Sequence, residues 1–436
     1  KLGIKSLLWK NNNKCKESDN LAKEIVECFL ANRITSHKND IFEDIGYNEF
    51  GPLLMCYSKW LLNNLKLNKI NKVFFLSRDG YIMKRAFDVI NNNPTIESKY
   101  FYASRRSIIV PSLKDCGNIN EILSRMYISK HTKIKSILKK IGLDDIIDEN
   151  FFLSNYDVNI NEEITLENIY TNEKYNRMFN DLYKKIINNS KFEYDNFNKY
   201  RNKMGFFGKL AIVDIGWFGN MQNALESLQL DSDICGYYIG IEPRKNYQSK
   251  YNMHGFLFET NRNYNIFLKE HNFNSIFEML FLGHHGSVKR FNISCSDLVE
   301  LYKYEYSDSK QENDILKLQN NAIEFVKDFY NSNLLDYIDG DLTWSFDYLC
   351  HRFLNPNLKT ATVFGNFFFL DDENNCIAKP SRFSRYINPA NLVRDYKRSA
   401  WRIGFLKRLL KISLPYYDIN MFIRRKYLKR KETKNE

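Results

Sequence analysis

Short apolar runs followed by polar loops recur through the first two thirds of the chain. Residues 72–77 (KVFFLS) and 99–103 (KYFYA) are each long enough for one buried strand, and residues 81–90 carry a helical pattern between them. A strand, a polar loop, a helix and a strand in that order are typical of a βαβ unit, which implies a parallel sheet. Further strands are predicted at residues 208–213, 234–241 and 254–258, with helices at residues 220–228 and 275–282.

Helical periodicity dominates the remaining chain. It predicts helices at residues 20–30 and 53–65, mostly helical structure over residues 118–200 and 297–351, and an apolar segment at residues 361–370. The predicted fold class is therefore α/β, with a Rossmann-like, mainly parallel sheet, helical insertions and a mostly helical C-terminal part. The predicted organisation is a lead segment that is a remnant of an upstream module (1–50), an α/β core domain (51–290), a mostly helical region (291–390) and a basic amphipathic segment (391–436).

Composition places the chain among globular proteins. Hydrophobic residues make up 44% and aromatic residues 15% of the 436 residues, which is enough apolar surface to offset the entropy of ordering the chain. No run of eighteen apolar residues is present, so no membrane-spanning helix is predicted. The eight cysteines include no C-x-x-C pair, which disfavours structural zinc and a disulfide scaffold and indicates the reduced thiols of a cytoplasmic protein.

Positive charge is concentrated near the C-terminal end. Residues 394–436 hold fourteen Lys or Arg and four Asp or Glu, a balance of +10, whereas the whole chain carries +12. Trp401, Phe405 and Leu409 recur at helical spacing among basic residues, a pattern typical of a helix at a membrane surface. Residues 394–431 are therefore predicted to contact the anionic inner face of the plasma membrane, and the alternative is a helix packed on the core. No nucleic acid is expected, because nucleic-acid enzymes usually spread their basic residues over the body of the fold.

Polar loops after the predicted strands carry the candidate chemistry, because ligands of open α/β sheets bind at the carboxyl ends of the strands. The loop at residues 77–80 (SRDG) matches the Asp-x-Asp-Gly motif of phosphoaspartyl hydrolases in its second Asp and its Gly. Ser77 stands at the position of the nucleophile and cannot form an acyl phosphate. Asp79 is thus a candidate acid or base, and Ser77, Arg78 and Gly80 are candidate ligand contacts. The alternative is a strand-end turn with a surface Arg–Asp pair.

Two further loops suit an anionic ligand. Arg105 and Arg106 follow the second predicted strand, and guanidinium groups are bidentate donors for phosphate or carboxylate. Asp214, a candidate catalytic group, follows the third, in a turn whose glycines would let the backbone approach a phosphate at the start of the next helix. The alternatives are a structural arginine and a tight turn that needs glycine. This turn adds four candidate ligand contacts, Gly216, Trp217, Gly219 and Gln222.

Two adjacent histidines follow the helix predicted at residues 275–282. His285 is a candidate general base, and Ser287 is a candidate phosphate contact. No H-x-x-x-H spacing is present, so no metal ligands are assigned. If Asp79, Asp214 and Glu278 converge, they are candidates to hold a divalent ion such as Mg²⁺ together with substrate phosphates.

The motifs, in this order, resemble the region downstream of the haloacid-dehalogenase-like module in large bacterial proteins of surface-polysaccharide gene clusters. Members of that family are usually labelled predicted hydrolases of the haloacid dehalogenase superfamily. The resemblance covers about residues 45–370. The matching motifs are GPLL at 51–54, FFLSRDG at 74–80, YASRR at 102–106, VDIGWFG at 213–219 with Gln222, GYYIG at 236–240, EMLF at 278–281, HGS at 285–287 and FLNP at 353–356.

The resemblance implies a role in the assembly of capsule, O-antigen or similar glycans. The family's hydrolase label belongs to an upstream module with a complete Asp-x-Asp site, which we expect to be missing here or reduced to residues before about 45. We therefore expect a glycosyl- or phosphoglycosyl-transferring enzyme that binds a nucleotide sugar or a sugar phosphate at the strand-end loops, with Mg²⁺ as the candidate cofactor. Two alternatives stay open: a degenerate phosphatase of the haloacid dehalogenase type, and a non-catalytic scaffold that binds a glycan or a protein partner.

Overall fold

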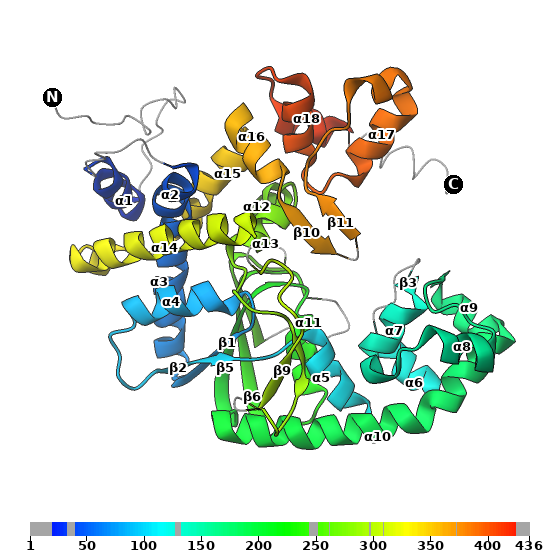
Figure 1. Cartoon of the computed structure of the whole chain (residues 1–436). Helices are drawn as coiled ribbons and strands as arrows, with labels where there is room; N and C mark the ends of the chain where they lie inside the picture. Colours follow the sequence, from blue (N-terminus) through cyan, green and yellow to red (C-terminus); the bar gives the residue numbers. More distant parts are fainter. Residues whose placement is uncertain are drawn as a thin grey trace.

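A five-stranded parallel sheet forms the centre of the computed structural model, which describes residues 20–32, 40–126, 132–243, 252–260, 262–295, 298–307, 309–371 and 373–423 (Figure 1). The strand order is β2-β1-β5-β6-β7, and every neighbouring pair is parallel. This confirms the predicted α/β class and the mainly parallel sheet. The strands are β1 (Lys72–Leu76), β2 (Glu97–Phe101), β5 (Gly208–Trp217), β6 (Ser232–Ile241) and β7 (Met253–Phe258).

The order of the strands reverses between β1 and β5. The chain adds β2 on one side of β1 and then returns to add β5, β6 and β7 on the other side. Phe75 pairs with Val213 near the carboxyl ends of these two strands. In an open parallel sheet such a reversal leaves a crevice at the carboxyl ends of the two strands, and ligands bind there.

Both faces of the sheet are covered, which explains the nearly continuous apolar runs of its strands. Val73 and Phe75 of β1 face one apolar cluster, whereas Phe74 and Leu76 face another. The first cluster includes α3 (Gly51–Leu67), α4 (Gly80–Ile90), α13 (Asn274–Leu280) and α14 (Lys310–Asn331). The second includes α5 (Arg105–Ser112), α10 (Glu173–Met204), α11 (Asn220–Glu226) and the antiparallel pair β8 (Val288–Phe291) and β9 (Val299–Leu301).

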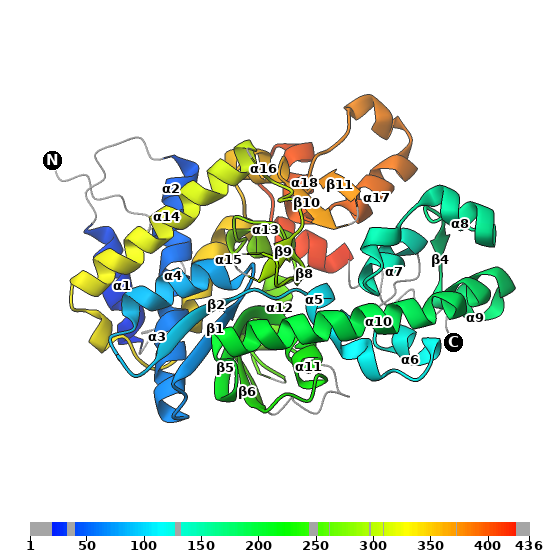
Figure 2. The same ribbon diagram turned by 60° about the horizontal axis from the view of Figure 1, so that its bottom comes forward.

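A helical insertion between α5 and α10 has an apolar core of its own. Figures 1 and 2 show it set to one side of the sheet, with the 32-residue helix α10 running from it back along the sheet. The helical pattern at residues 118–200 is thereby confirmed, apart from one short strand pair. The insertion comprises α6 (Ile119–Ser124), β3 (Thr132–Lys133), α7 (Ile134–Lys140), α8 (Glu149–Tyr156), β4 (Glu163–Ile164) and α9 (Leu166–Thr171).

The N-terminal and C-terminal helices pack on the first cluster. The mostly helical C-terminal part is as predicted, although β9 interrupts the stretch 297–351 that was predicted to be helical, and residues 368–371 of the apolar segment form a strand. Among the described residues, no helix has both the length and the apolar character needed to cross a bilayer. The remaining helices and strands are α1 (Leu21–Ala31), α2 (Ile41–Ile45), the π-helix Gly46–Phe50, α12 (Tyr264–Glu270), α15 (Asp347–Leu354), α16 (Leu358–Gly365), β10 (Phe368–Asp371), β11 (Glu373–Cys376), α17 (Pro389–Arg398) and α18 (Arg402–Leu410).

The apolar stripe predicted for a membrane is docked inside the protein. Trp401 and Phe405 are completely or almost completely buried, and the Trp401 indole N–H donates to the carbonyl oxygen of Phe353 at 3.2 Å. Leu409 is partly buried against the same core. The alternative of a helix packed on the core therefore describes α18, because its apolar side chains gain more by closing the first cluster than they would by facing water. Residues 424–431 of the predicted segment lie outside the described residues.

Candidate functional site

Three carboxylates from separate parts of the chain converge where the strand order reverses. Asp79 lies three residues after the end of β1 and directly precedes α4, Asp214 lies in the carboxyl-terminal half of β5, and Glu278 comes from α13. The three are close enough for the charges of Asp214 and Glu278 to act on the ionisation of Asp79. Both aspartates are only partly buried. The structure thus brings together the two aspartates predicted as catalytic groups.

Burial and mutual repulsion favour the protonated form of the two aspartates. Burial, followed by the charges of Asp214 and Glu278, raises the pKa of Asp79 well above its ordinary value. Burial also raises the pKa of Asp214 to about 6. A hydrogen bond from the Ile215 backbone N–H at 2.9 Å and the charge of Arg105 both lower the pKa of Asp214, but burial outweighs them. Both carboxyl groups therefore have a raised pKa, which suits acid–base catalysis near neutral pH.

Two neighbouring side chains hold Glu278 in position by donating hydrogen bonds to it. Its Oε1 accepts from the Trp217 indole N–H at 2.7 Å and from the Asn274 side-chain amide at 3.1 Å. The Trp217 ring stacks on Phe258 with ring centroids 5.9 Å apart. The indole N–H is the only side-chain donor of Trp217, a predicted ligand contact, and Glu278 accepts it.

Arg78 and Arg105 are the cations of the site. Both lower the pKa of Asp79, although burial and the neighbouring carboxylates outweigh them. The Arg78 guanidinium already forms a salt bridge of 2.9 Å with Glu305, which is partly exposed. Arg105 is exposed, and its side chain forms no hydrogen bond or salt bridge with any described residue. Arg105 is therefore the guanidinium available to an anionic ligand.

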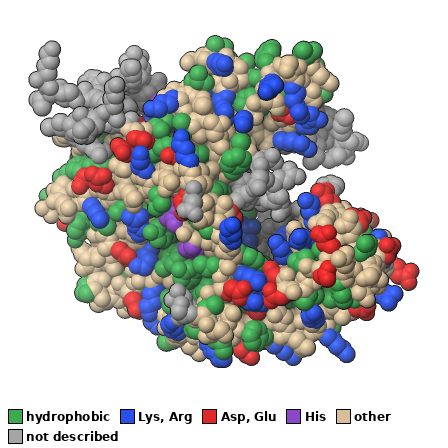
Figure 3. All heavy atoms as spheres, viewed as in Figure 1, with side chains coloured by type: hydrophobic (Ala, Val, Ile, Leu, Met, Phe, Trp, Pro, Cys, Tyr) green, Lys and Arg blue, Asp and Glu red, His purple; other side chains and the backbone are tan. Residues whose placement is uncertain are grey.

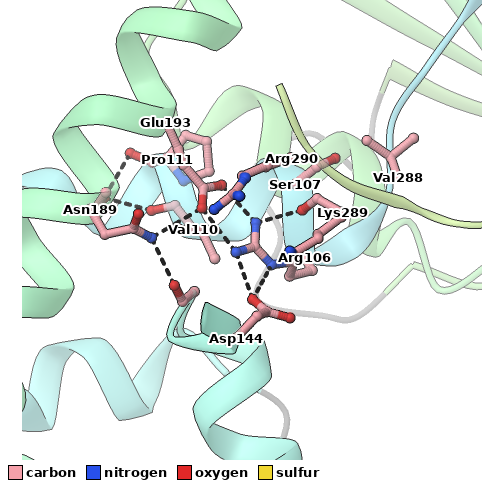
Figure 4. Close-up of polar contacts among 12 residues, drawn as sticks. Arg106, Ser107, Val110, Pro111, Asp144, Asn189, Glu193, Val288, Lys289 and Arg290 are labelled. Carbon is pink, nitrogen blue, oxygen red and sulfur yellow. Dashed lines mark hydrogen bonds and ion pairs between the residues drawn. The ribbon is translucent and has the colours of Figure 1, made fainter. Parts of the chain in front are cut away.

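The second arginine of the predicted pair, Arg106, belongs to a buried structural network instead (Figure 4). Its Nη1 donates to Glu193 at 2.7 Å, its Nη2 donates to Asp144 at 2.8 Å, and 9% of its side chain is exposed. Burial alone would lower the pKa of Arg106, but Glu193 and Asp144 more than compensate. The prediction that Arg106 binds ligand is corrected, because both carboxylates already occupy the guanidinium.

Ser77 and Gly80 also have structural roles. The Ser77 hydroxyl donates to the Ala103 carbonyl oxygen at 2.9 Å and accepts from the Ala103 N–H at 3.1 Å, so it links the segments that follow β1 and β2. A side chain at Gly80 would put its Cβ 2.8 Å from the backbone of Phe75. These two residues close the turn that presents Asp79, and neither was correctly predicted as a ligand contact.

The turn predicted to cradle a phosphate is mostly strand. β5 extends to Trp217, and Gly216, at φ +111°, pairs with Gly240 of β6 so closely that a Cβ would lie 2.2 Å from the Gly240 carbonyl oxygen. The missing Cβ of Gly219 would meet the Met253 sulfur at 2.5 Å. Close approach of β5 to β6 therefore explains Gly216, and the left-handed backbone of Gly219, at φ +70°, favours glycine directly before α11; neither glycine needs a phosphate to account for it.

Gln222 is a buried hydrogen-bonding residue rather than a ligand contact. Its amide N–H groups donate to Glu226 at 2.9 Å and to the Ile234 carbonyl oxygen at 3.1 Å. Its carbonyl oxygen accepts from the Tyr238 hydroxyl at 2.9 Å. All of its polar atoms are engaged away from solvent, so the predicted contact with a ligand is corrected.

His285 is joined to a tyrosine that sequence reasoning missed. Its Nδ1 is 2.8 Å from the Gly286 carbonyl oxygen, and its Nε2 is 2.7 Å from the Tyr100 hydroxyl. Burial lowers the pKa of His285, so the ring is neutral. Nδ1 then carries the proton and donates to Gly286, while Nε2 accepts from Tyr100. Ser287 follows, and its carbonyl oxygen accepts from the Tyr302 N–H at 2.9 Å.

Tyr100 connects this histidine with the carboxylates. The charge of Asp79 acts on the Tyr100 hydroxyl and, together with burial as the larger cause, raises the pKa of Tyr100. A Cβ at Gly283 would lie 3.3 Å from the same hydroxyl and 2.9 Å from the Arg78 carbonyl oxygen, so the loop after α13 meets the loop after β1. The only sequence signal for Tyr100 was its place in a strand that precedes Arg105.

Glu270 is a second carboxyl group that the sequence did not reveal. It lies at the end of α12, it is 1% exposed, and its Oε1 has no hydrogen-bond partner among the described residues. Burial and then the charge of Glu278 raise the pKa of Glu270 well above its ordinary value. Its burial and the nearby charge of Glu278 therefore both favour the uncharged form of Glu270.

The carboxylates do not form a preassembled metal cage. Within the part of the chain that the structure describes, no three His, Cys, Asp or Glu residues are arranged to hold a metal ion. Asp79 and Asp214 still match the donor set that Mg²⁺ takes from proteins when substrate phosphates complete its coordination, namely one or two carboxylates.

No family model matches the chain, and no curated protein matches it.

Proposed function

We propose that the protein is an enzyme that transfers a glycosyl or phosphoglycosyl group from a phosphate-bearing sugar bound at the carboxyl ends of β1 and β5. One observation carries the proposal: Asp79 and Asp214, whose pKa values are both raised, lie near Arg105 where the strand order reverses, and Arg105 forms no salt bridge with a described residue. This is the place where open α/β sheets bind their ligands, and Arg105 supplies the positive charge that a phosphate needs.

Each charged group has a distinct role in the proposed transfer. Asp214 removes the proton from an acceptor hydroxyl as its oxygen bonds to the transferred group, and the bond to the leaving phosphate oxygen breaks. Arg105 neutralises the charge that develops on that phosphate, and Asp79 donates its proton to the leaving oxygen. The charge of Glu278 raises the pKa of both aspartates, and Tyr100 lies close enough for the charge of Asp79 to act on its hydroxyl.

The substrate class rests on the motif resemblance. That resemblance points to surface-polysaccharide assembly, whose donors are nucleotide sugars and sugar phosphates, and we place the reaction at the cytoplasmic face of the plasma membrane. Phosphatase chemistry of the haloacid dehalogenase type would need a nucleophile at position 77. The Ser77 hydroxyl is held by Ala103 on both its donor and its acceptor side, so that chemistry is not part of the proposal.

A ligand screen coupled to variants tests the proposal. Thermal unfolding of the full chain is measured with a panel of nucleotide sugars and sugar phosphates, with and without Mg²⁺, because a bound ligand raises stability by RT ln(1 + [L]/Kd). We expect a selective stabilisation by one donor class. Asp79→Asn and Asp214→Asn should each lower transfer from that donor by about 100-fold or more, the usual contribution of a general acid or base.

The exposed Asp195 on α10 provides the matched control. Asp195→Asn should bind and transfer as the unmodified protein does. If no phosphate-bearing sugar stabilises the protein, or if both aspartate variants keep full transfer activity, the proposal is wrong. A rapid, Asp79-dependent hydrolysis of aryl phosphates would instead identify a phosphatase.

A further inference from the structure

Apolar side chains project into solvent from the segment that precedes α18. Phe383 is 79% exposed and Ile387 is 84% exposed, both in the 3-10 helix Phe383–Ile387, and Val393 of α17 is 50% exposed. Neither that 3-10 helix nor α17 contains a buried residue. We call residues 382–398 the apolar–basic surface.

Basic side chains surround these apolar groups. Five cations of the apolar–basic surface are exposed, namely Arg382, Arg385, Arg394, Lys397 and Arg398. Its one acidic residue, Asp395, is partly buried and accepts from the hydroxyls of Ser381 at 2.8 Å and Tyr386 at 3.2 Å. Asp395 also pairs with two of the five cations, Arg385 at 3.7 Å and Arg394 at 3.9 Å. In the space-filling view, lysine and arginine side chains gather over the C-terminal part of the molecule, with apolar side chains among them (Figure 3).

One side of this segment packs on the rest of the protein, although Phe383, Ile387 and Val393 face solvent. Leu392 and Tyr396 of α17 pack against the first apolar cluster, and the Tyr396 hydroxyl donates to Asn420. Asp395 ties the start of the segment to the helix through Ser381 and Tyr386. Phe383 and Ile387 are therefore exposed even though the segment that carries them is packed on the rest of the protein.

We propose that the apolar–basic surface docks the protein on an anionic lipid bilayer. Exposed apolar side chains among cations are complementary to such a bilayer surface. The apolar side chains would enter the boundary between the headgroups and the acyl chains. The cations would stay beside the anionic headgroups. A nucleic acid would use the cations but would leave Ile387 and Val393 in water. The chain continues beyond the described residues with six Lys or Arg among residues 424–431, which adds to the same charge complementarity.

This surface shares Arg394, Lys397 and Arg398 with the segment that the sequence predicted, but its exposed apolar side chains are different ones. The stripe Trp401, Phe405 and Leu409 is turned into the core, so it cannot insert into lipid. Phe383 and Ile387 lie before residue 394, outside the predicted membrane segment. The inference does not depend on the proposed transfer reaction, because none of its residues belongs to the carboxylate site.

Flotation of the full chain with vesicles tests the inference. Vesicles of phosphatidylcholine alone are compared with vesicles containing about one third phosphatidylglycerol, at low and at physiological salt. We expect binding to the anionic vesicles that is at least tenfold stronger than to the neutral ones and that weakens as salt rises. The double variant Phe383→Asp/Ile387→Asp should reduce binding to anionic vesicles at least tenfold.

A matched control separates this surface from exposed apolar residues in general. Leu67, at the end of α3, is 78% exposed, and Leu67→Asp should bind vesicles as the unmodified protein does. Thermal unfolding should be the same for all variants, because the substituted side chains are mostly in solvent. Equal binding to both vesicle types, or full binding by the double variant, would overturn the inference. Concentration-dependent self-association that the double variant abolishes, with no vesicle binding, would assign the surface to a second copy of the chain instead.

Discussion

Arg106 and Glu193 form a buried ion pair between α5 and α10, with Nη1 and Oε2 2.7 Å apart and no exposure of the Glu193 side chain. Asp144, from the helical insertion, binds the same guanidinium at 2.8 Å. Asn189 of α10 extends the network by donating both to Glu193 and to the Gly142 carbonyl oxygen (Figure 4). The network therefore fixes the insertion, α10 and α5 in one arrangement, beside the residue that leads into the candidate site, Arg105.

We expect Arg106→Ala to destabilise the protein by about 3–5 kcal/mol. Removal of the arginine leaves Glu193 and Asp144 as buried carboxylates without the cation that pairs with both, and this is the costly way to break a buried pair. Denaturant unfolding measures the loss. Arg177→Ala is the control, because Arg177 is 71% exposed in its pair with Asp181 and should cost no more than about 1 kcal/mol. Equal, small losses in the two variants would contradict the structural role of Arg106.

Arg105→Ala should weaken ligand binding without weakening the fold. The side chain is exposed and has no hydrogen bond or salt bridge within the described residues, so stability should change by less than about 0.5 kcal/mol. A lost charge-assisted contact to phosphate should raise the Kd of the donor found in the ligand screen roughly tenfold or more. Because Arg105 lowers the pKa of both Asp79 and Asp214, the acidic limb of the activity profile should also move to higher pH. An unchanged Kd would remove Arg105 from the site.

Stability should fall as pH rises through the range in which Asp214 ionises. The pKa of Asp214 is about 6 in the folded protein and 3.8 ordinarily, so the folded state binds a proton more tightly than the unfolded state does. The free energy of unfolding should therefore decrease between about pH 4 and pH 6 on account of this group, by on the order of 2 kcal/mol. Asp214→Asn should flatten that part of the curve. Denaturant unfolding at half-unit pH intervals measures this dependence, with Asp195→Asn as the reference variant. The prediction is wrong if the free energy of unfolding changes with pH to the same extent in both variants.

Gly216→Ala should be strongly destabilising because of the close approach of β5 to β6. A Cβ there would lie 2.2 Å from the Gly240 carbonyl oxygen, and the residue has φ +111°. We expect a loss of at least about 2 kcal/mol from strain and overpacking. Gly340 also has positive φ, at +83°, but nothing lies within 4 Å of its Cβ position, so Gly340→Ala should cost only about 1 kcal/mol. Similar unfolding midpoints for the two variants would argue against the packing role of Gly216.

Trp401→Ala should destabilise the protein without removing any side chain of the proposed bilayer contact. The side chain is fully buried against Phe353, so its removal should cost about 3–5 kcal/mol. Leu410→Ala, in the same helix at 45% exposure, should cost less than about 1 kcal/mol. Vesicle binding by the folded fraction of both variants should equal that of the unmodified protein. Selective loss of vesicle binding in a fully stable Trp401→Ala protein would show that this tryptophan faces lipid.

The strands and helices of the sheet were predictable because local patterns decide them. The apolar runs at residues 72–77 and 208–213 appear as β1 and β5, and the helical pattern at residues 81–90 appears as α4. A strand buried on both faces must be apolar throughout, and the residues after it must be polar to reach solvent. The same rule placed Asp79 in the turn directly after β1, whereas Asp214, predicted to follow its strand, lies inside β5, which continues to Trp217.

Which arginine faces the site could not be predicted, because Arg105 and Arg106 are adjacent and chemically the same. The first turn of α5 points Arg106 at Asp144 and Glu193, which are 38 and 87 residues away in the chain, and leaves Arg105 in solvent. Likewise, the glycines of the β5 turn suggested a phosphate, whereas the Gly240 carbonyl explains Gly216 and the left-handed backbone explains Gly219. Contacts between distant segments carry no local signal.

By itself the sequence determined the α/β class, the order of strands and helices in the sheet, and the place of Asp79 in the turn directly after β1, since burial and backbone periodicity act over a few neighbouring residues. Only the tertiary structure decided the strand order that brings Asp79 beside Asp214, the burial of Trp401 and the exposure of Phe383. These features depend on contacts between segments that are far apart in the chain. An apolar side chain at helical spacing produces the same sequence pattern whether it faces the protein core or a bilayer.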